Sequence, residues 1–188
     1  AAGVARVAHR TVDGRQGAEI RFNQVKVSEA ALIGELNGGY AIARDVLHEG
    51  LLALSAESVG SLSVLLNETV EYSKTRQQFG MPIGKFQVLQ HRMVDMMWEL
   101  EQARSMAILA ASVADEPQSD ERRRILAAAK NVIGRSGQFI SEQGIQSHGG
   151  IGMTWEYNFA HYAKRLVMIN HQLGDDDFHL ERFAALLK

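Results

Sequence analysis

One proline-free stretch constrains the fold of this chain more than any other. Residues 38–76 are GGYAIARDVLHEGLLALSAESVGSLSVLLNETVEYSKTR, and apolar side chains recur through them at helical spacing. The recurring positions are Leu47, Leu51, Leu54, Leu62 and Leu66. Residues three or four positions apart share one face of a helix, so the stretch predicts a single long helix with an apolar stripe.

Two further segments repeat this pattern. Residues 85–114 carry a stripe at Phe86, Leu89, Met93, Met97 and Leu100, and residues 125–140 carry a third. A shorter helix is expected after Trp155 and Glu156, and a last one from about Asp175 to Leu187. Three helices of roughly 25–35 residues with a short fourth predict a mainly α fold, an antiparallel four-helix bundle.

The first 36 residues have a different texture. Val4–Gly14 and Ala18–Val27 alternate apolar and polar side chains, as half-buried strands do, and Asp13-Gly14 is a turn signal between them. Two or three strands do not make a stable sheet alone. We therefore expect residues 1–36 to be the remnant of a truncated β-domain and residues 37–188 to form the helical-bundle domain.

Composition narrows the possible functions. The formal net charge of −2 gives no basic face for nucleic acid or an anionic membrane, and no unbroken apolar run is long enough to span a bilayer. There is no cysteine, and the seven histidines show no spacing typical of a metal site. The start of the chain lacks the pattern of a signal peptide. The expectation is a cytoplasmic protein without a metal.

Two loops carry candidate binding residues. In RQQFGMPIGKFQ, residues 76–87, the turn can be a simple helix stop, or Arg76 can hold a phosphate beside an aromatic wall at Phe79. In QSHGGIGMT, residues 146–154, the Gly149-Gly150 pair can end a helix or admit a ligand close to the backbone. Each loop alone favours the structural interpretation.

Together the motifs are more specific. Arg-x-x-Phe-Gly-x-Pro-Ile from Arg76, then Gln87, Asp95, LEQAR, Lys130 and Gln-x-x-Gly-Gly-x-Gly from Gln146 resemble the C-terminal half of an acyl-CoA dehydrogenase. The resemblance covers essentially the whole chain, whose first residues are similar to the end of the family's middle β-domain. The family's N-terminal helical domain and most of its β-domain have no counterpart here, so the chain resembles a fragment.

The resemblance implies FAD, which lies across a dimer interface within a tetramer in this family. Arg76 is then expected to contact the FAD pyrophosphate of a neighbouring subunit, and Phe79 and Gln87 to line the same dinucleotide. Gln146, Gly149 and Gly150 are expected at its adenosine side. The implied partners are an acyl-CoA substrate and same-family subunits in a homo- or hetero-oligomer, and the resemblance also admits electron-transfer flavoprotein.

The catalytic base departs from the family pattern. In the commonest branch a glutamate removes the α-proton of the thioester, and its position here is Leu173, followed by Gly174 and Asp175. A second branch places the glutamate on the first long helix, at a position that is Gly50 here. Leu51 replaces an arginine that contacts CoA in many members.

Glu49 and Asp175 are the remaining candidates for a base. Neighbouring residues on a helix point about 100° apart, so Glu49 substitutes poorly for an acid at position 50. Asp175 opens the last helix, where an acid suits the helix N-terminus.

We therefore expect an FAD-associated acyl-CoA dehydrogenase-like subunit without its own base that completes the FAD site of a partner, of a kind found in fatty acid or sterol degradation. Whether the chain is itself an enzyme stays open. The alternatives are an active flavoenzyme with a displaced carboxylate, Glu49 or Asp175, and a structural helical module without flavin.

Overall fold

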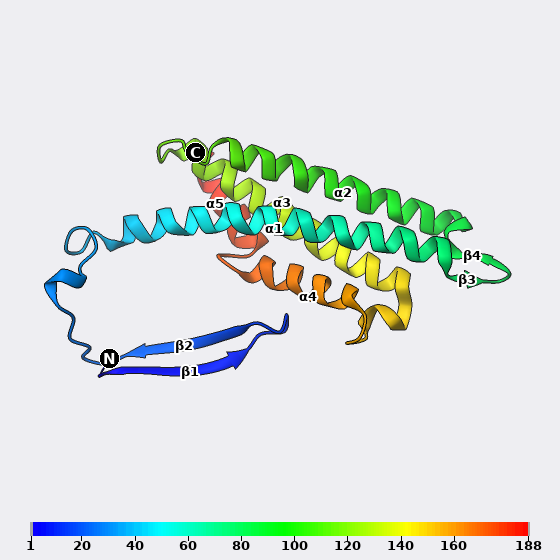
Figure 1. Cartoon of the computed structure of the whole chain (residues 1–188). Helices are drawn as coiled ribbons and strands as arrows, with labels where there is room; N and C mark the ends of the chain where they lie inside the picture. The colour runs from blue at the N-terminus through cyan, green and yellow to red at the C-terminus, as the bar shows by residue number, and fades with distance from the viewer. Residues whose placement is uncertain (1, 188) are drawn as a thin grey trace.

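The computed structural model describes residues 2–187 (Figure 1). An antiparallel hairpin of β1 (Val4–Arg10) and β2 (Gln16–Phe22) precedes the helices. The helices are α1 (Gly39–Thr75), α2 (Gln87–Ser112), α3 (Asp120–His148), α4 (Asn158–His171) and α5 (Asp176–Ala185). Short 3-10 turns lie at Glu29–Ala31, Ile83–Lys85 and Gly149–Met153. The predicted antiparallel helical bundle is confirmed.

α3 is the centre of the bundle and packs against α1, α2, α4 and α5. The core is made of side chains that these helices direct inward, among them Leu62, Leu65, Met96, Ile133, Ile140 and Phe159. Ser119 begins α3 as its N-cap, because its hydroxyl accepts a hydrogen bond from the Arg122 amide at 3.1 Å. The core therefore lies along the whole length of α3.

The inner face of α1 is more polar than its leucine pattern predicts. Leu51, Leu62 and Leu66 are buried, but Leu47 is exposed. Ser55, Ser58 and Thr69 of the same helix are buried as well. The hydroxyls of these three residues donate to the carbonyls four residues earlier at 2.7–2.8 Å. Such internal hydrogen bonds satisfy small polar side chains in a helix and allow neighbouring helices to approach closely.

By length and composition alone, α1 is the one helix among residues 2–187 that could cross a membrane. The core helix of a bundle passes the same test, and α1 packs against α2, α3 and α4. Its apolar composition is therefore explained by the bundle.

The β1–β2 hairpin lies beside the bundle and leaves both of its faces largely exposed (Figure 1). The predicted half-burial of these strands is therefore absent from the described part of the chain, and Val25 and Val27 follow the end of β2 rather than extending it. The turn signal at Asp13-Gly14 falls in the five-residue loop between Arg10 and Gln16.

A buried charge cluster holds the hairpin loop on the bundle. Arg165 of α4 donates to both oxygens of Glu57 on α1, at 2.6 and 2.7 Å, and to Asp13 in the loop at 3.1 Å. Arg15 adds a contact to Glu57 at 3.2 Å. Arg165 also donates to Gln172 at 3.0 Å, so the cluster reaches the connection between α4 and α5.

Sequence analysis missed a second, very short hairpin. β3 (Gln77–Gln78) and β4 (Met81–Pro82) pair directly after α1, with Phe79 and Gly80 as the two-residue turn. Both turn residues have positive φ, 55° and 79°, as a type I′ turn requires. α1 does stop at this loop, at Thr75, and the residues after it form a hairpin that projects from the end of the bundle (Figure 1).

Candidate functional site

Both positions that resemblance assigns to a glutamate meet at one point of the structure. Gly50 lies on α1 and Leu173 in the loop between α4 and α5. A β-carbon placed on Gly50 would lie 2.8 Å from Cδ1 of Leu173. Two residues more than a hundred positions apart in the sequence therefore occupy one location, and neither is an acid.

Leu173 has an uncommon backbone conformation. Its φ is 58°, in the left-handed region that non-glycine residues seldom adopt, and Gly174 follows with φ 96°. Such a residue persists where its surroundings determine its conformation, and strain of this kind clusters at functional sites. The turn thus presents the residue-173 side chain toward α1.

Buried donors hold this turn from inside the bundle. The ammonium of Lys130 on α3 donates to the carbonyls of Asn170 and Gly174, both at 2.8 Å. His179 Nε2 on α5 contacts the carbonyl oxygen of Leu173 at 2.9 Å. Burial lowers the pKa of Lys130 to about 8, against the favourable charges of Asp176 and Asp175, and burial also lowers the pKa of His179.

A cavity of about 300 Å³ opens beside Leu173. Leucines and a phenylalanine supply its apolar wall, and three arginines and two histidines supply its polar groups. The lining residues are Arg44, Leu47, His48, Leu51, Arg123, Leu126, Ala127, Leu173, Gly174, Phe178, His179 and Arg182. None of these is a carboxylate. The cavity can therefore accept an apolar group that carries negative charge, but its walls offer no carboxylate.

Glu49 lies apart from this cavity wall. Its carboxylate accepts a hydrogen bond from Arg122 on α3 at 2.9 Å, with the Glu49 side chain 63% exposed and that of Arg122 5% exposed. Arg122 also donates to the Ala114 carbonyl at 2.8 Å. Glu49 thus serves as counter-ion to a buried guanidinium.

Asp175 is the N-cap of α5. Its Oδ1 accepts a hydrogen bond from the Phe178 amide at 2.8 Å. Asp176 accepts from the Asn170 side chain at 3.0 Å, and Asp177 is exposed. These three acids therefore begin a helix, and no group of three or more potential metal ligands occurs among residues 2–187.

The expected cofactor residues lie at the opposite end of α1. Arg76 is the exposed C-cap of that helix, and Gln87 is the exposed first residue of α2. Between them Phe79 forms the tip of the β3–β4 turn with 88% of its surface exposed, and its ring meets Phe86 edge-on at 6.0 Å. A guanidinium, an aromatic face and an amide are thus presented outward on one short segment.

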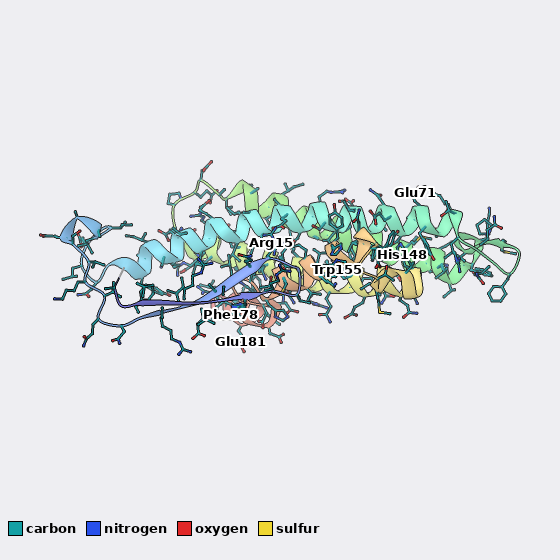
Figure 2. All side chains as sticks on the ribbon, turned by 60° about the horizontal axis from the view of Figure 1, so that its bottom comes forward. Arg15, Glu71, His148, Trp155, Phe178 and Glu181 are labelled. Atoms are coloured by element: carbon teal, nitrogen blue, oxygen red, sulfur yellow. The ribbon has the colours of Figure 1, made fainter. Side chains whose placement is uncertain are left out.

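The second cofactor loop lies at the same end of the bundle. Gln146, Gly149 and Gly150 are exposed where α3 ends, and a β-carbon on either glycine would meet no atom within 4 Å. Tyr72, one turn before Arg76, stacks on buried His148 with ring centroids 4.5 Å apart. Figure 2 shows His148 toward the β3–β4 end and Phe178 on α5 much farther along the bundle. The structure thus joins the two cofactor loops and separates them from Leu173.

Lys130 and His179 are the residues whose role sequence analysis missed. Lys130 entered only as part of a motif, and its sequence signal is a single charge inside the apolar stripe AAAKNVI of α3. No sequence pattern links His179 to the carbonyl of Leu173. Such contacts depend on how a loop returns to the bundle, which local sequence does not determine.

Comparisons with known proteins agree on one family. Residues 37–187 match the model of the acyl-CoA dehydrogenase C-terminal domain. Over 134 residues the chain is 37% identical to acyl-CoA dehydrogenase IpdE2 of Mycolicibacterium smegmatis, which covers 71% of this chain and 41% of that protein.

Solved structures extend the match to the hairpin. The structure of PigA with FAD and proline superimposes with a TM-score of 0.90 at 31% identity and covers 99% of this chain and 49% of that one. The ChsE4–ChsE5 complex from Mycobacterium tuberculosis gives 0.90 at 26% identity, with the same coverage. The chain therefore spans less than half the length of these relatives.

Proposed function

This chain belongs to the acyl-CoA dehydrogenase family, and we propose that it is the C-terminal part of an FAD-associated subunit whose own catalytic base is lost. In this proposal residues 1–36 end the middle β-domain, and residues 37–188 form the C-terminal helical domain. The subunit contributes Arg76, Phe79 and Gln87 to the flavin site of a same-family partner, while its own acyl-CoA pocket is silent.

The single observation that carries the proposal is the contact between Gly50 and Leu173. A glutamate at either position would place its carboxylate at this point, but position 173 is a leucine and position 50 is a glycine. Proton abstraction next to a thioester carbonyl needs a base within hydrogen-bond reach of that carbon. The adjoining cavity is lined by arginines and histidines, which suit the phosphates of an acyl-CoA, and by no carboxylate.

FAD fits the residues at the other end of α1. When bound, FAD supplies the hydride acceptor of the dehydrogenation. Arg76 can pair with a pyrophosphate, the exposed Phe79 ring offers a stacking face, and Gln87 offers an amide. Gly149 and Gly150 leave space for a ligand to approach the backbone. All of these groups point outward, which favours a flavin shared with a neighbouring subunit.

The partner is proposed to be a second subunit of the same family that retains its glutamate. The structural similarity to the ChsE4–ChsE5 complex, an assembly of two proteins, supports a heteromeric arrangement. A structure of electron transferring flavoprotein from Acidaminococcus fermentans is also similar, with a TM-score of 0.90 at 27% identity. We therefore also propose electron-transfer flavoprotein as the electron acceptor.

A displaced base is the second candidate function. Glu49 is paired with Arg122 and is absent from the lining of the cavity beside Leu173, and Asp175 is engaged as a helix cap. Replacing Glu49 with glutamine or Asp175 with asparagine separates the two accounts. Under our proposal neither replacement changes acyl-CoA-dependent flavin reduction, whereas loss of reduction in one of them would identify the base.

The direct test is to restore the acid in the full-length protein. Leu173→Glu should create acyl-CoA-dependent flavin reduction, because the turn already directs residue 173 toward the pocket. The matched control is Leu173→Gln, which has the size and polarity of glutamate but no basic group, and should stay inactive. Failure of Leu173→Glu with FAD bound would show that more than the base has been lost.

A further inference from the structure

We propose that Lys130 is the positioning residue of the turn that carries residue 173. It holds this turn in the conformation that directs the residue-173 side chain toward Gly50. The position that would suit an acid is therefore kept in a chain that has no acid there. The inference rests on the proposed function of this site. It adds a residue on the central helix that contacts neither substrate nor flavin.

The contacts of Lys130 bracket the turn. Its ammonium donates to the carbonyl of Asn170, in the last turn of α4, and to the carbonyl of Gly174, just before the α5 cap. His179 contacts the Leu173 carbonyl from α5. Carbonyls on both sides of the turn are thus held by one cation, and the carbonyl between them is held by an imidazole.

Burying the Lys130 ammonium costs free energy, so its hydrogen bonds must offset that cost. Lys130 is 1% exposed, and lysine is among the residues least often fully buried. The acids facing it are Asp176 and Asp175, which stabilise the ammonium, and the neighbouring titratable group is His179, whose pKa burial lowers. An aliphatic side chain could fill the space but could not donate to two carbonyls that point inward. The cation therefore serves the backbone of the turn.

The held backbone is the strained one. Leu173 adopts φ 58° without the freedom of glycine, and its side chain reaches the open face of Gly50. Packing of an apolar side chain does not by itself require this backbone conformation. Placing the residue-173 side chain at a fixed point beside Gly50 does require it. An acid at position 173 would project from the same backbone toward the same point.

The rate of disulfide formation between positions 50 and 173 reports how the turn places residue 173, and it does not depend on flavin chemistry. Residues 1–188 contain no cysteine, so Gly50→Cys with Leu173→Cys introduces one pair into this part of the protein, and any cysteine elsewhere is first replaced by serine. In the full-length protein we expect this pair to oxidise rapidly, and about tenfold more slowly when Lys130→Met is added. Lys26→Met, at an exposed lysine of the hairpin segment, is the matched control and should have no effect. Equal oxidation rates with and without Lys130 would overturn the proposal.

A second readout separates positioning from general stability. In the Leu173→Glu protein, Lys130→Met should lower the first-order rate of flavin reduction about tenfold or more while acyl-CoA affinity changes less than about twofold. Equal losses in rate and affinity would contradict a positioning role. If Leu173→Glu is inactive with FAD bound, more than the base has been lost from the pocket, and the cross-linking result still decides the role of Lys130.

Discussion

At the residue scale, a buried ion pair fixes the arrangement of the segments that it joins, although burying its charges costs free energy. Arg165 joins the hairpin loop, α1 and the approach to Leu173 through Asp13, Glu57 and Gln172. Breaking a buried ion pair leaves a desolvated charge without a counter-ion and is strongly destabilising. The cluster is therefore a structural connection between the β-segment and the loop of the candidate site.

Replacing Arg165 with methionine should lower the free energy of unfolding by about 3 kcal/mol, because Asp13, with a side chain 2% exposed, loses its main cation. Arg15→Met is the control, since this exposed partner of Glu57 should contribute less than about 1 kcal/mol. Urea unfolding of the full-length proteins measures both. Similar losses in the two variants would contradict the assignment of the buried pair.

The same cluster predicts a dependence on pH. A hydrogen bond from Arg165 lowers the pKa of Glu57, and hydrogen bonds from Thr11, Arg15 and Arg165 lower the pKa of Asp13 although burial opposes this. Depressed carboxyl pKa values stabilise the folded state above about pH 4, and this stability is lost as the pH falls through the folded-state values. Unfolding free energies of the parent should therefore decline more steeply below about pH 4 than those of Arg165→Met.

At the element scale, sequence predicted helices far better than their connections. Periodicity located the three long helices because apolar side chains recur along each of them, although Leu47 and Met97 of the predicted stripes are exposed. The β3–β4 hairpin escaped prediction because it has two residues per strand and a phenylalanine in a left-handed position, where turn chemistry favours asparagine or glycine. Family motifs in the sequence suggested candidate site residues, but the Gly50–Leu173 contact and the Lys130 hydrogen bonds depend on tertiary packing and could not be predicted.

A substitution in the β3–β4 turn should raise the stability of the protein and weaken its binding of FAD. Phe79→Asn places a residue suited to positive φ before Gly80 and should raise the free energy of unfolding by about 0.5 kcal/mol. It also removes the aromatic face proposed for FAD, so the assembled protein should release FAD more readily. Thermal unfolding and the FAD content after gel filtration test the two effects. Unchanged FAD retention would remove Phe79 from the proposed flavin site.

At the scale of the whole molecule, the two candidate regions lie apart on one bundle. The groups proposed to face the flavin lie where α1 ends, α2 begins and α3 ends, whereas the Leu173 turn lies between α4 and α5 (Figure 1). Under our proposal, loss of a base in one region leaves the other intact, because no described hydrogen bond connects Arg76 or Phe79 to the Leu173 turn. A subunit silent in its own pocket can therefore still complete the flavin site of a neighbour.

The measurement that tests this account most directly is the anaerobic flavin spectrum of the full-length protein before and after addition of acyl-CoA. It should be recorded for the protein alone and for the protein assembled with its same-family partner. We expect the flavin absorbance to bleach only in the assembled complex, and Arg76→Ala in this subunit to reduce the FAD content of that complex. Bleaching of the protein alone would contradict the account, because it would require a base that neither Leu173 nor Gly50 provides.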